Sequence, residues 1–115
     1  MNKSTITIDV FLDVNKIPEK ISWKASDKNA DMAHIAKAMS VAFWDGTDKT
    51  ALSIDLWSKD MMVDEMADFY YQILMTMADT FHRATQYQDM SDDMKKFAKA
   101  FFEKFREKQI QEQSK

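Results

Sequence analysis

One segment decides the fold class: Leu52-Ser53-Ile54-Asp55-Leu56-Trp57-Ser58-Lys59-Asp60-Met61-Met62-Val63-Asp64-Glu65-Met66. Up to Trp57 the aliphatic side chains recur at every second residue, which predicts a half-buried strand. After Asp60 the hydrophobic period changes to 3.6, which predicts an amphipathic helix. The chain therefore changes from sheet to helix near residue 60.

The residues before this segment repeat the period of two. Asp45-Gly46 precedes the last alternating run and predicts a hairpin turn. Residues 26–35 are polar and could form a loop or a short helix. The run 36–44 alternates but contains alanine, so a helix is the alternative there. The predicted strands are about 4–12, 20–25, 36–44 and 50–58.

The residues after this segment predict two helices, at about 63–86 and 91–109. Ser91 is the expected N-cap of the second helix. The tail 109–115 loses the pattern and is expected to fray. The apolar stripe of the first helix is Met66, Phe69, Tyr70, Ile73, Met77, Phe81 and Ala84.

These elements add up to an α+β chain of 115 residues that we expect to form a single domain, 1–115. Each predicted element has one apolar face, so each must be covered by another element. We therefore predict a four-stranded antiparallel sheet in ββββαα order, with the two C-terminal helices packed on one face. Residues 61–90 carry a net charge of −4 and residues 91–115 one of +2, so neighbouring helices should attract each other weakly.

Composition excludes several classes of function. A net charge of −3 argues against nucleic acid as a partner. No stretch approaches the roughly 18 apolar residues of a membrane span, so we expect no direct membrane insertion. The N-terminal residues lack the apolar run of a secretion signal, which predicts a cytoplasmic location. The chain has no cysteine and one glycine, which leaves no thiolate metal site and no glycine-rich phosphate loop.

The polar residues show no catalytic pattern. Asp79 and His82 share one turn of the first predicted helix, but catalysis needs a further positioned partner. Tyr70 is a weaker candidate for the same reason. The ten methionines are scattered over all elements, as expected of flexible core filler or of an adaptable partner groove. We therefore predict no catalytic residue, no metal and no cofactor.

Three aromatic residues point away from the predicted helical layer: Phe11, Trp44 and Trp57. Three large rings on one open sheet face indicate a contact with something else. Internal packing is an equally weighted alternative, because a β-bulge or the segment 26–35 could cover a ring. These residues are the candidate partner surface.

Two stretches, Ile54–Met66 and Met77–Thr85, resemble the family of the gliding motility protein GldC of Bacteroidetes. The opening strand and the segments Ile21–Trp23 and Ser40–Asp45 are similar to that family as well. The family pattern often has proline at the position of Met62 and glycine at that of Gln86. These residues would suit a helix start and a helix end.

The resemblance implies an accessory protein of bacterial gliding, a machinery linked to type IX secretion, acting without catalysis through contacts with a protein partner. The partner's identity does not follow from the resemblance. A homodimer that buries the same sheet face or an edge strand is a second hypothesis. An alternative function is binding of a small hydrophobic ligand or lipid in a pocket between sheet and helices.

Overall fold

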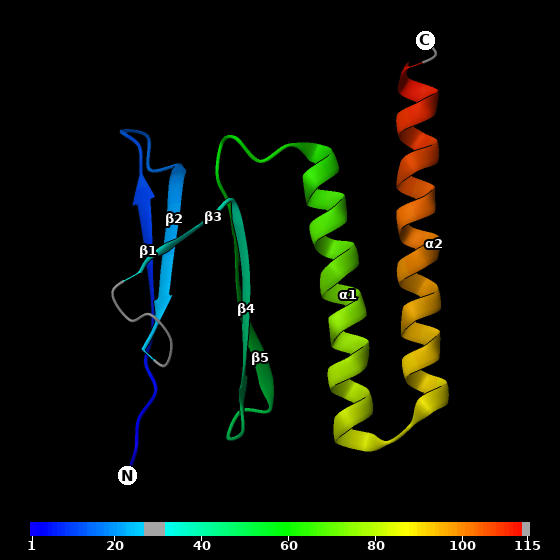
Figure 1. Cartoon of the computed structure of the whole chain (residues 1–115), viewed down its shortest axis with the longest axis horizontal. Coiled ribbons are helices and arrows are strands. Elements are labelled where there is room, and N and C mark those ends of the chain that lie inside the picture. The colour runs from blue at the N-terminus through cyan, green and yellow to red at the C-terminus, as the bar shows by residue number, and fades with distance from the viewer. Residues whose placement is uncertain (27–31, 114–115) are drawn as a thin grey trace. The chain divides into compact units, whose positions relative to one another are not determined.

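The computed structural model describes residues 1–26 and 32–113 and divides the chain into two compact units, Met1–Met61 and Met62–Lys115 (Figure 1). Strands form the first unit and helices the second, which confirms the predicted α+β class and the change of structure near residue 60. The elements are β1 (Ile6–Leu12), β2 (Pro18–Ala25), β3 (His34–Ala36), β4 (Ala38–Asp45), β5 (Thr50–Trp57), α1 (Val63–Thr85) and α2 (Gln88–Gln113).

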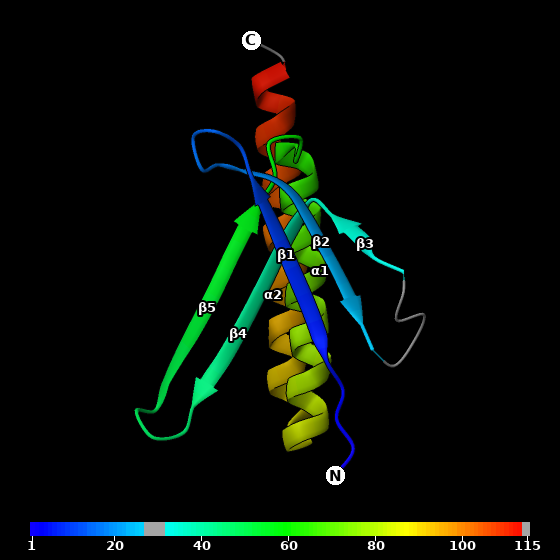
Figure 2. The same ribbon diagram turned by 90° about the vertical axis from the view of Figure 1, so that its left-hand side faces the viewer.

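The strands form two antiparallel sheets, so the prediction of one four-stranded sheet was wrong (Figure 2). One sheet has the order β1-β2-β3 and the other is the hairpin β4-β5. The predicted strand 36–44 is interrupted at Lys37, where the chain bends. The short piece before the bend pairs with β2 and the long piece after it pairs with β5.

The segment 26–35 was predicted to be a loop or a short helix. Its end is instead part of β3, where Ile35 lies opposite Ser22 of β2. Residues 27–31 of this segment lie outside the described residues. A strand of three residues shows no measurable alternation, so pairing with β2 decided its structure rather than its own pattern.

The bend at Lys37 is held by Ser58. The backbone N–H of Ser58 donates to the carbonyl oxygen of Lys37 at 2.7 Å, just beyond the pair Ala38–Trp57 that begins the hairpin ladder. Ser58 is 2% exposed, and its hydroxyl donates to Asp60 at 2.6 Å. A buried serine with both polar groups bonded stabilises this corner without an orphaned donor.

The alternation predicted for the first two strands is confirmed. Antiparallel partners lie on the same face, and Ile8 pairs with Trp23 while Val10 pairs with Ile21. Ile21 also lies opposite Ala36 of β3 and is 1% exposed, so it forms the centre of this sheet. The register shifts after Phe11, which marks a β-bulge or a similar irregularity at the end of β1.

Both hairpin turns use an aspartate and a lysine. The carboxylate of Asp13 accepts from the backbone N–H of Asn15 and Ile17, and Lys16 has a φ of 63°. In the turn 46–49 the carboxylate of Asp45 accepts from two backbone N–H groups, and Lys49 has a φ of 57°.

The hairpin turn expected after Asp45 is confirmed, but its glycine has no special role. Gly46 does not adopt a positive φ, and a Cβ atom added there would meet nothing within 4 Å. The left-handed residue is the lysine at the end of the turn. Its cost of about 1 kcal/mol is offset by the aspartate that closes the turn.

The two helices pack through small residues. Ala67 and Ala78 of α1 and Ala98 of α2 are buried, which lets the backbones approach closely. The rings of Tyr71 and Phe102 lie 5.1 Å apart across the helix pair. The Lys95 ammonium is 2.8 Å from the Asp79 carboxylate, which confirms the expected attraction between the acidic and basic helices.

The helix ends differ in part from the predictions. Helix α1 starts after the N-cap Met62, whose N–H donates to Glu65, and ends at Gln86 in a left-handed conformation. Helix α2 begins at Gln88, so the prediction of Ser91 as its N-cap was wrong: Ser91 is buried and its hydroxyl donates to the carbonyl of Gln88. The predicted fraying from residue 109 was also wrong, because the helix continues to Gln113. A single domain and helices packed on one sheet face stay predictions.

We predict that Gln86→Gly stabilises the protein by about 1 kcal/mol, because Gln86 has a φ of 64° and glycine has no Cβ to oppose that conformation. The N–H of Gln86 would still donate to the carbonyl of His82. Urea denaturation followed by circular dichroism measures the change. Gln86→Ala is the control and should bring no gain; equal stabilisation by both variants would contradict the explanation.

Candidate interaction surface

The three predicted rings are exposed at their positions in the fold: Phe11 by 49%, Trp44 by 68% and Trp57 by 57%. Trp44 lies opposite Ala51 and Trp57 opposite Ala38 on one face of the β4-β5 hairpin. Six residues separate the two indole positions along the ladder, which corresponds to about 20 Å. This face, with Trp44 and Trp57 at its ends, is called the indole face below.

Small and polar side chains lie between the two indoles. Ser40 faces Asp55, and the Ser40 hydroxyl donates to the Asp55 carboxylate at 2.7 Å. Ala42 faces Ser53 in the next pair. Two large exposed rings with small and polar side chains between them are typical of a surface where aromatic side chains anchor a protein contact.

Phe11 belongs to the other sheet, so the three rings do not share one sheet face as the sequence predicted. It lies in β1 opposite Lys20, whose ammonium sits 5.2 Å from the ring centroid. This cation–π contact restrains the ring where the strand register shifts. The sequence could not separate Phe11 from the indoles because alternation gives neither the register between strands nor the bend at Lys37.

The opposite face of the hairpin is apolar and was predicted to point inward. Its cross-strand pairs include Phe43–Leu52 and Val41–Ile54. Phe43, Leu52 and Ile54 are each at least half exposed. A core face and a binding face have the same alternating apolar pattern, so the inward orientation of this face stays a prediction.

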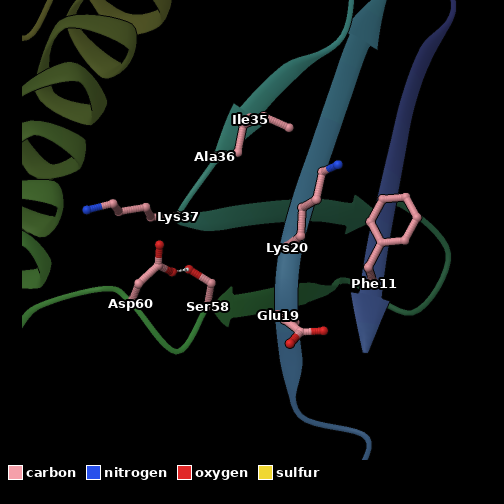
Figure 3. Close-up of a pocket in the computed structure, with 8 residues that line it drawn as sticks. All are labelled: Phe11, Glu19, Lys20, Ile35, Ala36, Lys37, Ser58 and Asp60. Atoms are coloured by element: carbon pink, nitrogen blue, oxygen red, sulfur yellow. Dashed lines mark hydrogen bonds between the residues drawn. The ribbon is translucent and has the colours of Figure 1, made fainter. Parts of the chain in front are cut away.

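A pocket of about 470 Å³ lies in the first unit (Figure 3). The ammonium groups of Lys20 and Lys37 point in different directions in Figure 3, and the Ser58 hydroxyl is bonded to Asp60. The polar groups of the pocket therefore do not converge on one ligand position. The pocket is also lined by none of the methionines expected of a hydrophobic-ligand site. The residues that line it are Phe11, Glu19, Lys20, Ile35, Ala36, Lys37, Ser58 and Asp60.

The first unit contains one ion pair that joins distant segments. The ammonium of Lys59, just after β5, contacts the carboxylate of Asp13 in the β1–β2 turn. Hydrogen bonds from Lys59 and from the backbone N–H groups of Ile17 and Asn15 lower the pKa of Asp13 below its usual value. The same carboxylate thus shapes its own turn and ties that turn to the end of the hairpin.

The side chains considered as catalytic candidates, Asp79, His82 and Tyr70, do not form a catalytic group. Lys95 holds the Asp79 carboxylate and lowers its pKa, mainly through a hydrogen bond. The Nδ1 atom of His82 is buried and has no hydrogen-bond partner among the described residues. Tyr70 packs its ring against Phe69 at 5.8 Å. No nucleophile, base and orienting group come together among these side chains.

Residues 1–26 and 32–113 contain neither a metal-binding cluster nor a helix that could span a membrane. No group of three or more histidine, aspartate or glutamate side chains in these ranges could hold a metal ion. Neither of the two helices there combines the length and apolar character needed to cross a membrane.

The model of one protein family, described as gliding motility-associated protein GldC-like, matches residues 18–107. The chain belongs to the GldC-like family. This match confirms the resemblance seen in the sequence, and both stretches that carried it, Ile54–Met66 and Met77–Thr85, lie inside the matched range. A comparison with curated proteins finds no significant match, and neither does a comparison with solved structures.

The family match contains the elements that form the indole face. Strands β2 to β5 and helix α1 of this GldC-like chain lie inside the matched range, while β1 with Phe11 lies before it. The left-handed Gln86 is also inside the matched range, at a helix end where glycine would adopt the same conformation without strain.

We predict that Asp13→Asn lowers stability at pH 7 and that the difference from the wild type is smaller at about pH 3, below the unfolded pKa of Asp13. The folded-state pKa of Asp13 is depressed, so its ionised form stabilises the fold above the unfolded pKa near 3.8, and this stabilisation is lost as the pH falls through the folded value. Asparagine keeps an oxygen acceptor for the turn but loses the charge. Urea denaturation at both pH values provides the measurement.

Asp48→Asn, an exposed change in the other turn, is the control and should leave stability nearly unchanged. A deficit for Asp13→Asn that is equal at both pH values would show that the ion pair with Lys59 contributes nothing.

Proposed function

We propose that this GldC-like chain is a non-enzymatic accessory protein of bacterial gliding that acts from the cytoplasm and binds a protein partner through the indole face. Phe11 is a separate, secondary contact in this proposal. Family membership supports the link to gliding motility, and the contact mechanism is our inference.

The observation that carries the proposal is the exposure of Trp44 and Trp57 on one face of a single hairpin. Tryptophan is enriched among the residues that dominate binding energy, because its large ring loses water on contact and keeps few rotamers to freeze. Small residues between the rings leave room for side chains of the partner.

The carboxylate of Asp55, near the middle of the indole face, is also compatible with burial in a protein contact. Asp55 is its only charged strand residue between the two indoles, and it already accepts a hydrogen bond from Ser40. A partly satisfied carboxylate costs less to desolvate than an isolated one. The polar group can therefore set the register of a partner while the rings supply affinity.

We predict that Trp44→Ala with Trp57→Ala lowers partner affinity at least about a hundredfold, since a tryptophan that anchors an interface contributes about 2 kcal/mol or more. Affinity capture from the native cells identifies the partner, and calorimetry with that purified partner measures the affinity. Phe11→Ala alone should have a smaller effect.

Tyr87→Ala with Phe97→Ala removes two exposed rings of the helical unit and is the matched control, with binding retained. Unfolding of the double tryptophan variant in circular dichroism would place the indoles in the core. Unchanged affinity of a folded double variant would refute the proposed surface.

A further inference from the structure

Strand β5 has an unpaired edge in the part of the chain that the structure describes. Its described partner is β4, and Figures 1 and 2 place β5 on the side of the hairpin away from the three-stranded sheet. Unpaired strand edges carry free backbone donors and acceptors and tend to pair with another chain. This edge is called the β5 edge below.

The β5 edge lacks the features that normally protect an edge strand. It runs for eight residues, Thr50–Trp57, without proline or lysine and with Asp55 as its single charge. Its register with β4 has no irregularity. The outer strands of the other sheet differ, because β1 has a register shift after Phe11 and a central Asp9 and β3 has three residues. Strand β4 has the second unpaired edge of the hairpin among the described residues, and the Val41→Cys variant below tests it.

We propose that β5 pairs antiparallel with β5 of a second copy of this chain, about a two-fold axis that passes beside Ile54. Residues that lie opposite each other in an antiparallel pair point to the same face. The apolar faces of the two copies therefore coincide only when the numbers of opposed residues are both even or both odd, so that their sum is even. Centring on Ile54 gives a sum of 108 and joins the two hairpins into a four-stranded sheet. This inference is independent of the proposed partner at the indole face.

The register about Ile54 matches side chains on both faces. On the apolar face Leu52 lies opposite Leu56 of the second copy, and Ile54 lies opposite itself. On the indole face Ser53 lies opposite Asp55 of the second copy, which repeats the Ser40–Asp55 pair seen at 2.7 Å within the chain. Neither face places like charges opposite each other.

A register centred on Ser53 matches less well. It would place Asp55 opposite Ala51 of the second copy and Leu56 opposite Thr50, so it loses both the serine–carboxylate pair and one apolar pair. The number of paired residues is the same in the two registers, and the side chains therefore decide between them.

Single cysteines test the register, because the chain has no cysteine of its own. Opposed residues of an antiparallel pair have Cα atoms about 4.5 or 5.5 Å apart, which a disulfide can span. We expect Ile54→Cys to form a cross-linked dimer under a mild oxidant. Ser53→Cys should not cross-link, because its copies would lie about 8 Å apart.

Charge at Ser53 gives a second test of the same contact. Ser53→Asp places carboxylates opposite each other twice in the dimer and should raise the dimer Kd about tenfold, whereas Ser53→Lys should lower it. Ala42→Asp adds the same charge opposite Ser53 on β4, away from the β5 edge, and should leave the Kd nearly unchanged. Sedimentation velocity measures the Kd, and circular dichroism confirms the fold of each variant.

Three results would overturn the proposal. The first is sedimentation of the wild type as a 13.5 kDa monomer up to about 100 μM, a test that needs no variant. The β5 edge could then pair only with a strand of another protein. The second is a folded Ile54→Cys variant that cross-links no better than Ser53→Cys. The third is efficient cross-linking of Val41→Cys, which would place the contact on β4. Partner binding at the indole face is measured separately, so the two proposals can fail independently.

Discussion

The bend at Lys37 is the constraint on which the first unit depends. A single run of chain from His34 to Asp45 takes part in both sheets, because the bend lets its start pair with β2 and its remainder pair with β5. The hydrogen bond from Ser58 to Lys37 continues the hairpin ladder up to this corner. Were the run straight, β3 and β4 would be one strand, a single sheet of four strands would result, and the indole face would be continuous with β1 and β2.

Tight packing in this molecule is confined to a few positions. Ile21 is the buried centre of the three-stranded sheet, and three alanines hold the helices together. Ion pairs mark the joints: Asp13–Lys59 links the ends of the two hairpins, and Asp79–Lys95 links the helices. Much apolar surface is left for contacts on the hairpin β4-β5, which is where both proposals place a macromolecule.

The candidate surface was only partly predictable. The period of two places Trp44 and Trp57 on the same side of their strands, and the register confirms that they share a face. Phe11 has the same alternation, yet it belongs to another sheet, because alternation fixes a side chain relative to its own strand and not relative to a distant one. The family match adds the biological setting but assigns no role to these rings.

The sequence by itself determined the elements: a period of two before residue 60 and of 3.6 after it fixed strands first and helices second. It also determined the turn after Asp45, since an aspartate can bond the backbone of its own turn. Only the tertiary structure decided the strand His34–Ala36, the bend at Lys37 and the early start of α2 at Gln88. The strand and the bend arise from pairing between segments far apart in the chain, and no local period records such contacts.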